Sequence, residues 1–178
     1  MISVSGVYEV DVEVGKDYSI TLTGPAYEMD NVKVENDDGM LKLGSKKKKW
    51  NKRGHRDGIE ATISLPALVE VKVSGVASGD ITGVDAEDFE LHVSGVAEVE
   101  IDGKCGKLQA HVSGVGELDA RELKCEDADV HLSGVGEMSV YATDYADISA
   151  SGVGEVDVYG DPEKVDKNKS LFTQINIK

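Results

Sequence analysis

Three of the four histidines in the chain recur at nearly equal spacing. His92, His111 and His131 each stand three residues before the glycine of a Ser-Gly-Val tripeptide. If the repeats stack as β-coils, these imidazoles lie side by side at roughly 4.8 Å, and Glu90 and Asp129 share their face. Such a row could hold a soft divalent ion such as Zn²⁺ or Ni²⁺, although stacked side chains lie in a line rather than around a tetrahedron. Two interpretations follow, a weak metal site and a solvated row of histidines that the repeat has copied.

The two cysteines also occupy equivalent positions in neighbouring repeats. Cys105 and Cys125 each precede the glycine of the next tripeptide by nine residues. At strand spacing, about 4.8 Å, their Cα atoms fall within the separation that a disulfide accepts. The pair is therefore either a bridge between adjacent coils or two small buried thiols.

Acidic residues occupy most of the positions three and five residues after the glycines, among them Glu98, Glu117, Glu137 and Glu155. A row of carboxylates can hold Ca²⁺, but the Gly-Gly-x-Gly-x-Asp signature of calcium-binding solenoids is missing from the sequence. A solvated face that discourages pairing with other chains is the favoured interpretation. Polysaccharide hydrolysis requires two carboxyls across a cleft, one with a raised pKa, whereas these acids are regular and none stands apart. Without a Ser-His-Asp motif, a P-loop or Gly-x-Gly-x-x-Gly, the sequence predicts neither an enzyme nor a cofactor.

One segment reverses the acidic character of the chain. The formal net charge is −15, yet residues 46–56 hold seven of the 19 Lys and Arg residues and no acid, which leaves 12 basic against 34 acidic residues elsewhere. This loop could bind a polyanion or the acidic face of a second copy, or it is a solvated hairpin tip. The overall charge argues against a nucleic-acid partner. The candidate binding residues are Lys46, Lys47, Lys48, Lys49, Trp50, Lys52, Arg53 and Arg56.

These residues are positioned by a repeat of about 19–20 residues. Glycines of the tripeptide stand at Gly75, Gly95, Gly114, Gly134 and Gly152, with an earlier copy at Gly6. Apolar and polar residues alternate on both sides of each glycine, as in strands with one buried face. A unit this short cannot bury its apolar face alone, so we predict that the repeats stack as a parallel β-helix rather than forming the longer blades of a propeller. We expect each corner glycine to have a positive φ. With 5% aromatic residues, the core must be aliphatic.

The chain is expected to form a single all-β domain over residues 1–178. Residues 1–66 are predicted to hold N-terminal coils, the basic loop 45–58, and a hairpin of Val32–Glu35 with Met40–Leu43 around Asp37-Asp38-Gly39. Residues 67–160 carry the repeats, and residues 161–178 are expected to cap the open end of the helix. No apolar run reaches the roughly 18 residues of a membrane helix.

The motifs resemble those of one bacterial family. VSGVYEVDVEVG, a hairpin ending in LKL, the junction ISLPALVEVKVSGVA and serial SGVGE repeats closing with YGDP look like the GIN-domain family, the head domains of putative autotransporter adhesins. The resemblance implies a right-handed, single-stranded, pectin-lyase-like β-helix and a non-enzymatic role in adhesion or self-assembly in the envelope or on the surface of a Gram-negative bacterium. Partners would then be further copies of the chain, a cell-surface glycan or a protein.

Two alternatives remain open at this point, a carbohydrate- or metal-binding module and a degenerate polysaccharide-processing enzyme. Family members usually carry an export signal or a lipoprotein leader. Met1–Val10 lacks the basic start and apolar stretch of a signal peptide. We expect that a leader has been removed from this sequence.

Overall fold

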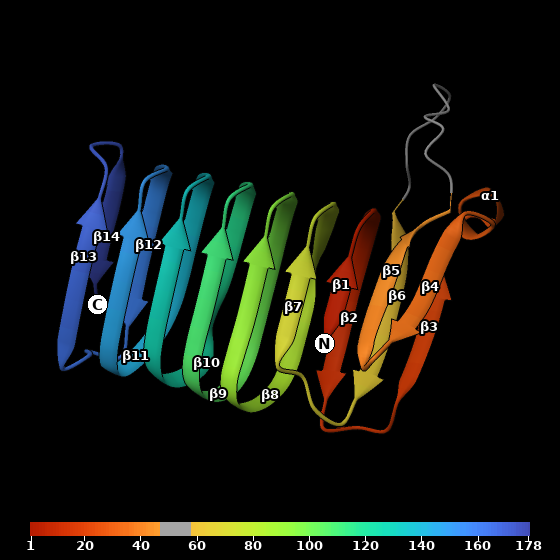
Figure 1. Cartoon of the computed structure of the whole chain (residues 1–178), viewed down its shortest axis with the longest axis horizontal. Coiled ribbons are helices and arrows are strands. Elements are labelled where there is room, and N and C mark those ends of the chain that lie inside the picture. The colour runs from red at the N-terminus through yellow and green to blue at the C-terminus, as the bar shows by residue number, and fades with distance from the viewer. Residues whose placement is uncertain (47–57) are drawn as a thin grey trace.

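The computed structural model describes residues 1–46 and 58–178, and in them the chain winds into a stack of parallel β-coils (Figure 1). In the figure, from β7 onward, the chain rises along the nearer strands, turns back at the top and advances one rung to the left with each coil, so the helix is right-handed. The predicted β-helix is confirmed. Its elements are β1 (Ile2–Val4), β2 (Val7–Val14), β3 (Ser19–Thr23), α1 (Ala26–Met29), β4 (Val32–Asp37), β5 (Met40–Ser45), β6 (Ile59–Leu65), β7 (Glu70–Val73), β8 (Val76–Val93), β9 (Val96–Val112), β10 (Val115–Leu132), β11 (Val135–Ala150), β12 (Val153–Tyr159), β13 (Lys164–Lys169) and β14 (Thr173–Ile177).

Each long strand from β8 to β11 begins just after a Ser-Gly corner, bends in its middle and ends just before the next corner. Two outer surfaces result. The histidine face carries the outward residues of β7, of the second halves of β8–β11 and of β13. The glutamate face carries those of β2, of the first halves of β8–β11 and of β12. Equivalent residues of successive coils pair in register, so a residue type repeated in sequence becomes a ladder in space.

The apolar columns of the repeat form the core. The column four residues before each glycine, Val71, Leu91, Ala110, Val130 and Ile148, lies inside the helix, and none of its members is more than 4% exposed. Each large aliphatic side chain buried in this way contributes about 1.5–3 kcal/mol. The alternation of the sequence thus determines which residues face outward.

The corner glycines are required by close packing rather than by backbone conformation. The expectation of a positive φ is wrong, because neither Gly75 nor Gly95, nor any other glycine of a Ser-Gly-Val corner, has one. A Cβ atom on Gly95 would instead collide with the carbonyl oxygen of Gly75 in the coil beneath. Val96 donates its backbone N–H to that same oxygen, at 2.9 Å. Successive corners are stacked too closely for any side chain.

The N-terminal half is arranged differently from its order in sequence. The first coil, β1 and β2, lies inside the stack, because β1 pairs with both β5 and β7 and β2 pairs with both β6 and β8. The predicted hairpin forms from β4 and β5, with φ values of 48° at Asp38 and 80° at Gly39 in its two-residue turn. Two positive φ values are typical of the type I′ turn, which matches the twist of a hairpin.

The two ends of the helix differ from the coils between them. At the N-terminal end, β3 and β4 run antiparallel to β6 and β5. At the C-terminal end, Lys167 and Lys169 of β13 occupy positions that hold Ile148 and Ala150 in the neighbouring coil. Charged residues at inward positions of an edge strand discourage addition of another strand.

Candidate functional site

The three ladder histidines lie in one row on the histidine face. His92 pairs with His111 and His111 pairs with His131 in the strand register. The rings stack with centroids 5.0 and 4.7 Å apart and interplanar angles of 5° and 6°. Parallel rings direct their nitrogens side by side instead of toward a common point, so this arrangement alone does not approach a tetrahedral ligand set.

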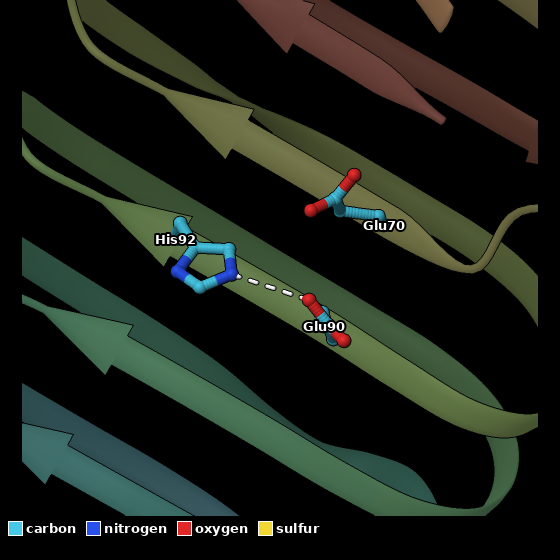
Figure 2. A group of neighbouring side chains, drawn as sticks. All are labelled: Glu70, Glu90 and His92. Atoms are coloured by element: carbon cyan, nitrogen blue, oxygen red, sulfur yellow. Dashed lines mark hydrogen bonds and ion pairs between the residues drawn. The ribbon is translucent and has the colours of Figure 1, made fainter.

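A tighter group of ligand-type side chains lies at one end of this row (Figure 2). One donor atom each from Glu70, Glu90 and His92 lies within 4.8 Å of the other two. Glu70 comes from β7, whereas Glu90 and His92 come from the neighbouring part of β8. Sequence reasoning named Glu90 and His92 but missed Glu70. The repeat contained the signal, because Glu70 and Glu90 both stand five residues before a corner glycine.

Lysine and histidine side chains contact the acidic residues of this face. Lys72 Nζ lies 2.5 Å from Glu70 Oε1, and His92 Nε2 lies 3.4 Å from Glu90 Oε2. Glu70 is only 9% exposed. Further along the row, His131 Nε2 lies 3.0 Å from Asp129 Oδ1. The group of Glu70, Glu90 and His92 therefore has one competing cation, Lys72, already in place.

The pKa of His111 is lowered from its ordinary value. Partial burial disfavours its charged form, and its neighbours His131 and His92 add to the effect, while Asp129 and Glu90 oppose it weakly. A neutral imidazole is the form that can bind a metal ion.

The two cysteines are joined by a disulfide in this structure. Cys105 and Cys125 are direct partners in the register of β9 and β10, with Cα atoms 4.5 Å apart. The bridge faces the core, since both cysteines are buried. It links two adjacent coils in the middle of the stack.

Most of the predicted polyanion-binding loop lies outside the described residues. This applies to Lys47, Lys48, Lys49, Trp50, Lys52, Arg53 and Arg56. Lys46 is described and exposed, and its backbone N–H donates to the carbonyl of Asn31 at 2.8 Å.

The glutamate face carries two parallel ladders. The acidic ladder predicted from the repeat is present, with Glu98, Glu117, Glu137 and Glu155 in register. Next to it runs a ladder of valines that sequence reasoning missed, which we name the valine stripe: Val76, Val96, Val115, Val135 and Val153, each 48–52% exposed. The signal was again in the repeat, because the residue after each glycine lies on the same side of the strand as the glutamate two residues later.

A recess of about 720 Å³ lies further along the same coils, on the side of the glutamate face away from the corners. Its lining includes Asp119, Arg121, Lys124, Tyr141 and Tyr159. Arg121 is paired with Asp119, and Lys124 Nζ lies 4.2 Å from the centre of the Tyr141 ring. The charged side chains of Asp119, Arg121 and Lys124 thus already have partners within the recess.

Comparison with known proteins decides the family. The family described as "Putative auto-transporter adhesin, head GIN domain" matches residues 1–162. The chain belongs to the GIN-domain family. A search of curated proteins finds no significant match to this GIN domain.

Solved structures share the fold of this GIN domain. A putative adhesin from Bacteroides fragilis is 20% identical and has a TM-score of 0.74, with 99% of this chain and 91% of that chain covered. A putative adhesin from Parabacteroides merdae is 14% identical, with a TM-score of 0.50 and coverage of 99% and 90%. The descriptions of the family and of these neighbours are those of putative adhesins rather than of enzymes. In the described part of the chain, no helix is long and apolar enough to cross a membrane.

Proposed function

We propose that this GIN domain is a non-enzymatic module of the bacterial cell envelope or surface, and that it mediates adhesion or self-assembly through its glutamate face. The observation that carries this proposal is the valine stripe, five half-exposed valines in consecutive coils. Single exposed apolar residues are common, but a continuous row of them is typical of an interaction surface. The neighbouring glutamates would limit unspecific association by mutual repulsion.

The carboxyl groups favour binding over catalysis. A glycosidase needs a general acid whose pKa is raised. Among the described residues, the carboxyls with clearly shifted pKa values, Asp37, Asp119, Asp157 and Asp166, are all shifted downward. In the recess, the hydrogen bond from Arg121 holds the pKa of Asp119 below its ordinary value. This is opposite to the shift that an acid catalyst requires.

The disulfide between Cys105 and Cys125 supports a location outside the cytoplasm. Structural disulfides persist in oxidising compartments such as the periplasm and the cell surface. Together with the family, this leads us to place the domain in the periplasm or on the surface of a Gram-negative bacterium.

The stripe can be tested by replacing Val96, Val115 and Val135 together with serine. Sedimentation velocity would measure self-association, and immobilised glycans and extracellular-matrix proteins would measure adhesion. We expect the variant to remain folded and to lose the interaction of the wild type. The matched control replaces Val34 and Val69, which are also exposed but lie outside the stripe.

Three outcomes would contradict the proposal. Equal behaviour of the stripe variant and the wild type would remove the stripe from the interaction. Glycan binding that survives in the stripe variant but is lost when Tyr141 and Tyr159 are changed to alanine would favour a carbohydrate-binding module centred on the recess. Release of sugar fragments from a polysaccharide would favour the degenerate enzyme.

A further inference from the structure

We propose that Glu70, Glu90 and His92 bind a divalent first-row transition-metal ion on the histidine face. Two carboxylates and one imidazole are ligands that Zn²⁺, Mn²⁺ and related ions accept. Three protein ligands leave further coordination positions for water or for an external group. The inference stands independently of the adhesion proposal, because the valine stripe lies on the glutamate face.

The distances require only a small closure around the ion. Ligand atoms about 2.0–2.2 Å from a tetrahedral ion are about 3.3 Å apart. His92 Nε2 and Glu90 Oε2 are already 3.4 Å apart, and the widest separation within the group does not exceed 4.8 Å. A movement of about 1.5 Å at the end of the long Glu70 side chain would complete the set. Figure 2 shows Glu70 and Glu90 on adjacent strands, and His92 further along the strand that carries Glu90.

The electrostatics of the group favour a cation. Glu70 and Glu90 are direct partners in the register of β7 and β8, so two carboxylates stand side by side at strand spacing. Like charges directly opposite one another destabilise a sheet. Among the described residues, the Lys72 ammonium offsets part of this repulsion through its contact with Glu70. A divalent ion would neutralise both carboxylates and release the Lys72 ammonium to solvent.

The same face contains a natural comparison. Asp129, Asp147 and His131 form a similar set two coils further along. The neighbouring acid lies on the opposite side, because Asp129 pairs with Asp147 of the following coil, whereas Glu90 pairs with Glu70 of the preceding one. Aspartate side chains are shorter than those of glutamate. Among the described residues, the three side chains whose donor atoms lie close enough together to share an ion are Glu70, Glu90 and His92. The longer glutamates therefore distinguish the proposed site from its copy.

The test is a titration of the tag-free chain of residues 1–178 with ZnCl₂ and, separately, with MnCl₂, followed by isothermal calorimetry. We expect one ion per chain. Glu70→Gln, Glu90→Gln and His92→Gln should each weaken binding at least tenfold, while circular dichroism remains unchanged. Asp129→Asn and His131→Gln, the matched controls, should bind as the wild type does. Lys72→Met should bind more tightly, since it removes the competing cation.

Two results would overturn the inference. The first is no binding by the wild type at 1 mM metal, since a Kd of 1 mM corresponds to a binding free energy of only about 4 kcal/mol. This result would show that the group is only an ion-paired surface. Loss of binding in His111→Ala together with unchanged binding in Glu70→Gln would assign the ion to the histidine row His92, His111 and His131 instead. Failure of one variant to fold would leave the other two ligand variants and Lys72→Met to decide.

Discussion

The carbonyl oxygen of Gly75 occupies the space that a Cβ atom on Gly95 would need. The same oxygen accepts the backbone N–H of Val96, so it cannot move away without breaking a hydrogen bond between coils. We therefore expect Gly95→Ala to lower the free energy of unfolding by about 2–4 kcal/mol, through overpacking of backbone against backbone. Urea unfolding followed by circular dichroism measures this.

The matched control is Gly58→Ala. Among the residues that the structure describes, a Cβ at Gly58 would meet only a methyl group of Val7, at an ordinary contact distance of 3.9 Å. Its effect should stay within about 0.5 kcal/mol. Equal, small effects of the two substitutions would show that the corners can separate, and that the glycine has some other role.

The corner shows where sequence reasoning succeeds and where it fails. The period of the repeat predicted that the coils stack and that Gly95 lies at a corner, because both follow from the alternation and the spacing of the residues. The reason for glycine was wrong, because φ depends on the path of the chain between coils, which no local pattern specifies. The order of the N-terminal coils could not be predicted for a similar reason. The pairing of β1 with β5 joins residues about 40 positions apart, and the hairpin signal around Gly39 is purely local.

A second prediction tests the assignment of the buried face. Val112 is 4% exposed and lies in the apolar column two residues before the corner glycine. Val112→Asp would bury an unpaired carboxylate, so we expect it to cost more than about 4 kcal/mol and to prevent folding. Thermal melts of Val112→Asp and of Gln109→Asp, an outward position on the same strand, provide the comparison. A loss of only a few degrees for Val112→Asp would mean that the wrong face of the strand is assigned to the core.

The candidate site was only partly accessible from the sequence. The register of the stacked strands could be deduced from the repeat, and this register predicted the row of His92, His111 and His131. The direction of the ring nitrogens could not, because χ angles depend on the neighbouring side chains. Glu70 was missed because its coil carries Lys72 where the next three coils carry histidine, so the search for a repeated histidine passed over it.

The third prediction concerns the bridge between Cys105 and Cys125, which are 20 residues apart. Closing a loop of this length stabilises a protein by about 3 kcal/mol, chiefly by restricting the unfolded chain. We expect dithiothreitol to lower the urea midpoint of the wild type and to leave that of the Cys105→Ala, Cys125→Ala double variant unchanged.

Alkylation under denaturing conditions provides a separate measurement of the cysteines. Protein prepared from the periplasm should incorporate no alkylating reagent before reduction and two equivalents after it. Two free thiols before reduction would indicate that the pair remains as small buried residues, the second interpretation of the sequence.

The last prediction concerns the C-terminal strand. β14 pairs with β12, and Asp157 of β12 accepts hydrogen bonds from Asn176 Nδ2, at 2.7 Å, and from Lys178 Nζ. Burial alone would raise the pKa of Asp157, but the hydrogen bonds from Lys178 and Asn176 outweigh it, and the pKa is held below its ordinary value. A carboxyl whose pKa is lower in the folded state than in the unfolded state stabilises the protein above the unfolded value of about 3.9, and this contribution is lost as the pH falls through the folded value.

Asp157→Asn should therefore lower the free energy of unfolding at pH 7 by about 1.5–3 kcal/mol, the range for hydrogen bonds to a charged group. The difference between wild type and variant should shrink below about pH 4 and vanish once Asp157 is protonated in both states. Urea unfolding at half-unit steps from pH 7 to pH 2 measures the difference, and Asp88→Asn, at an exposed position of β8, controls for the loss of one negative charge. Because the partners of Asp157 are Asn176 of β14 and Lys178, the residue that follows β14, hydrogen exchange should show that strand opening first in the variant. A difference that stays constant with pH would mean that the asparagine disturbs packing, and that the ion pair with Lys178 does not hold the strand in place.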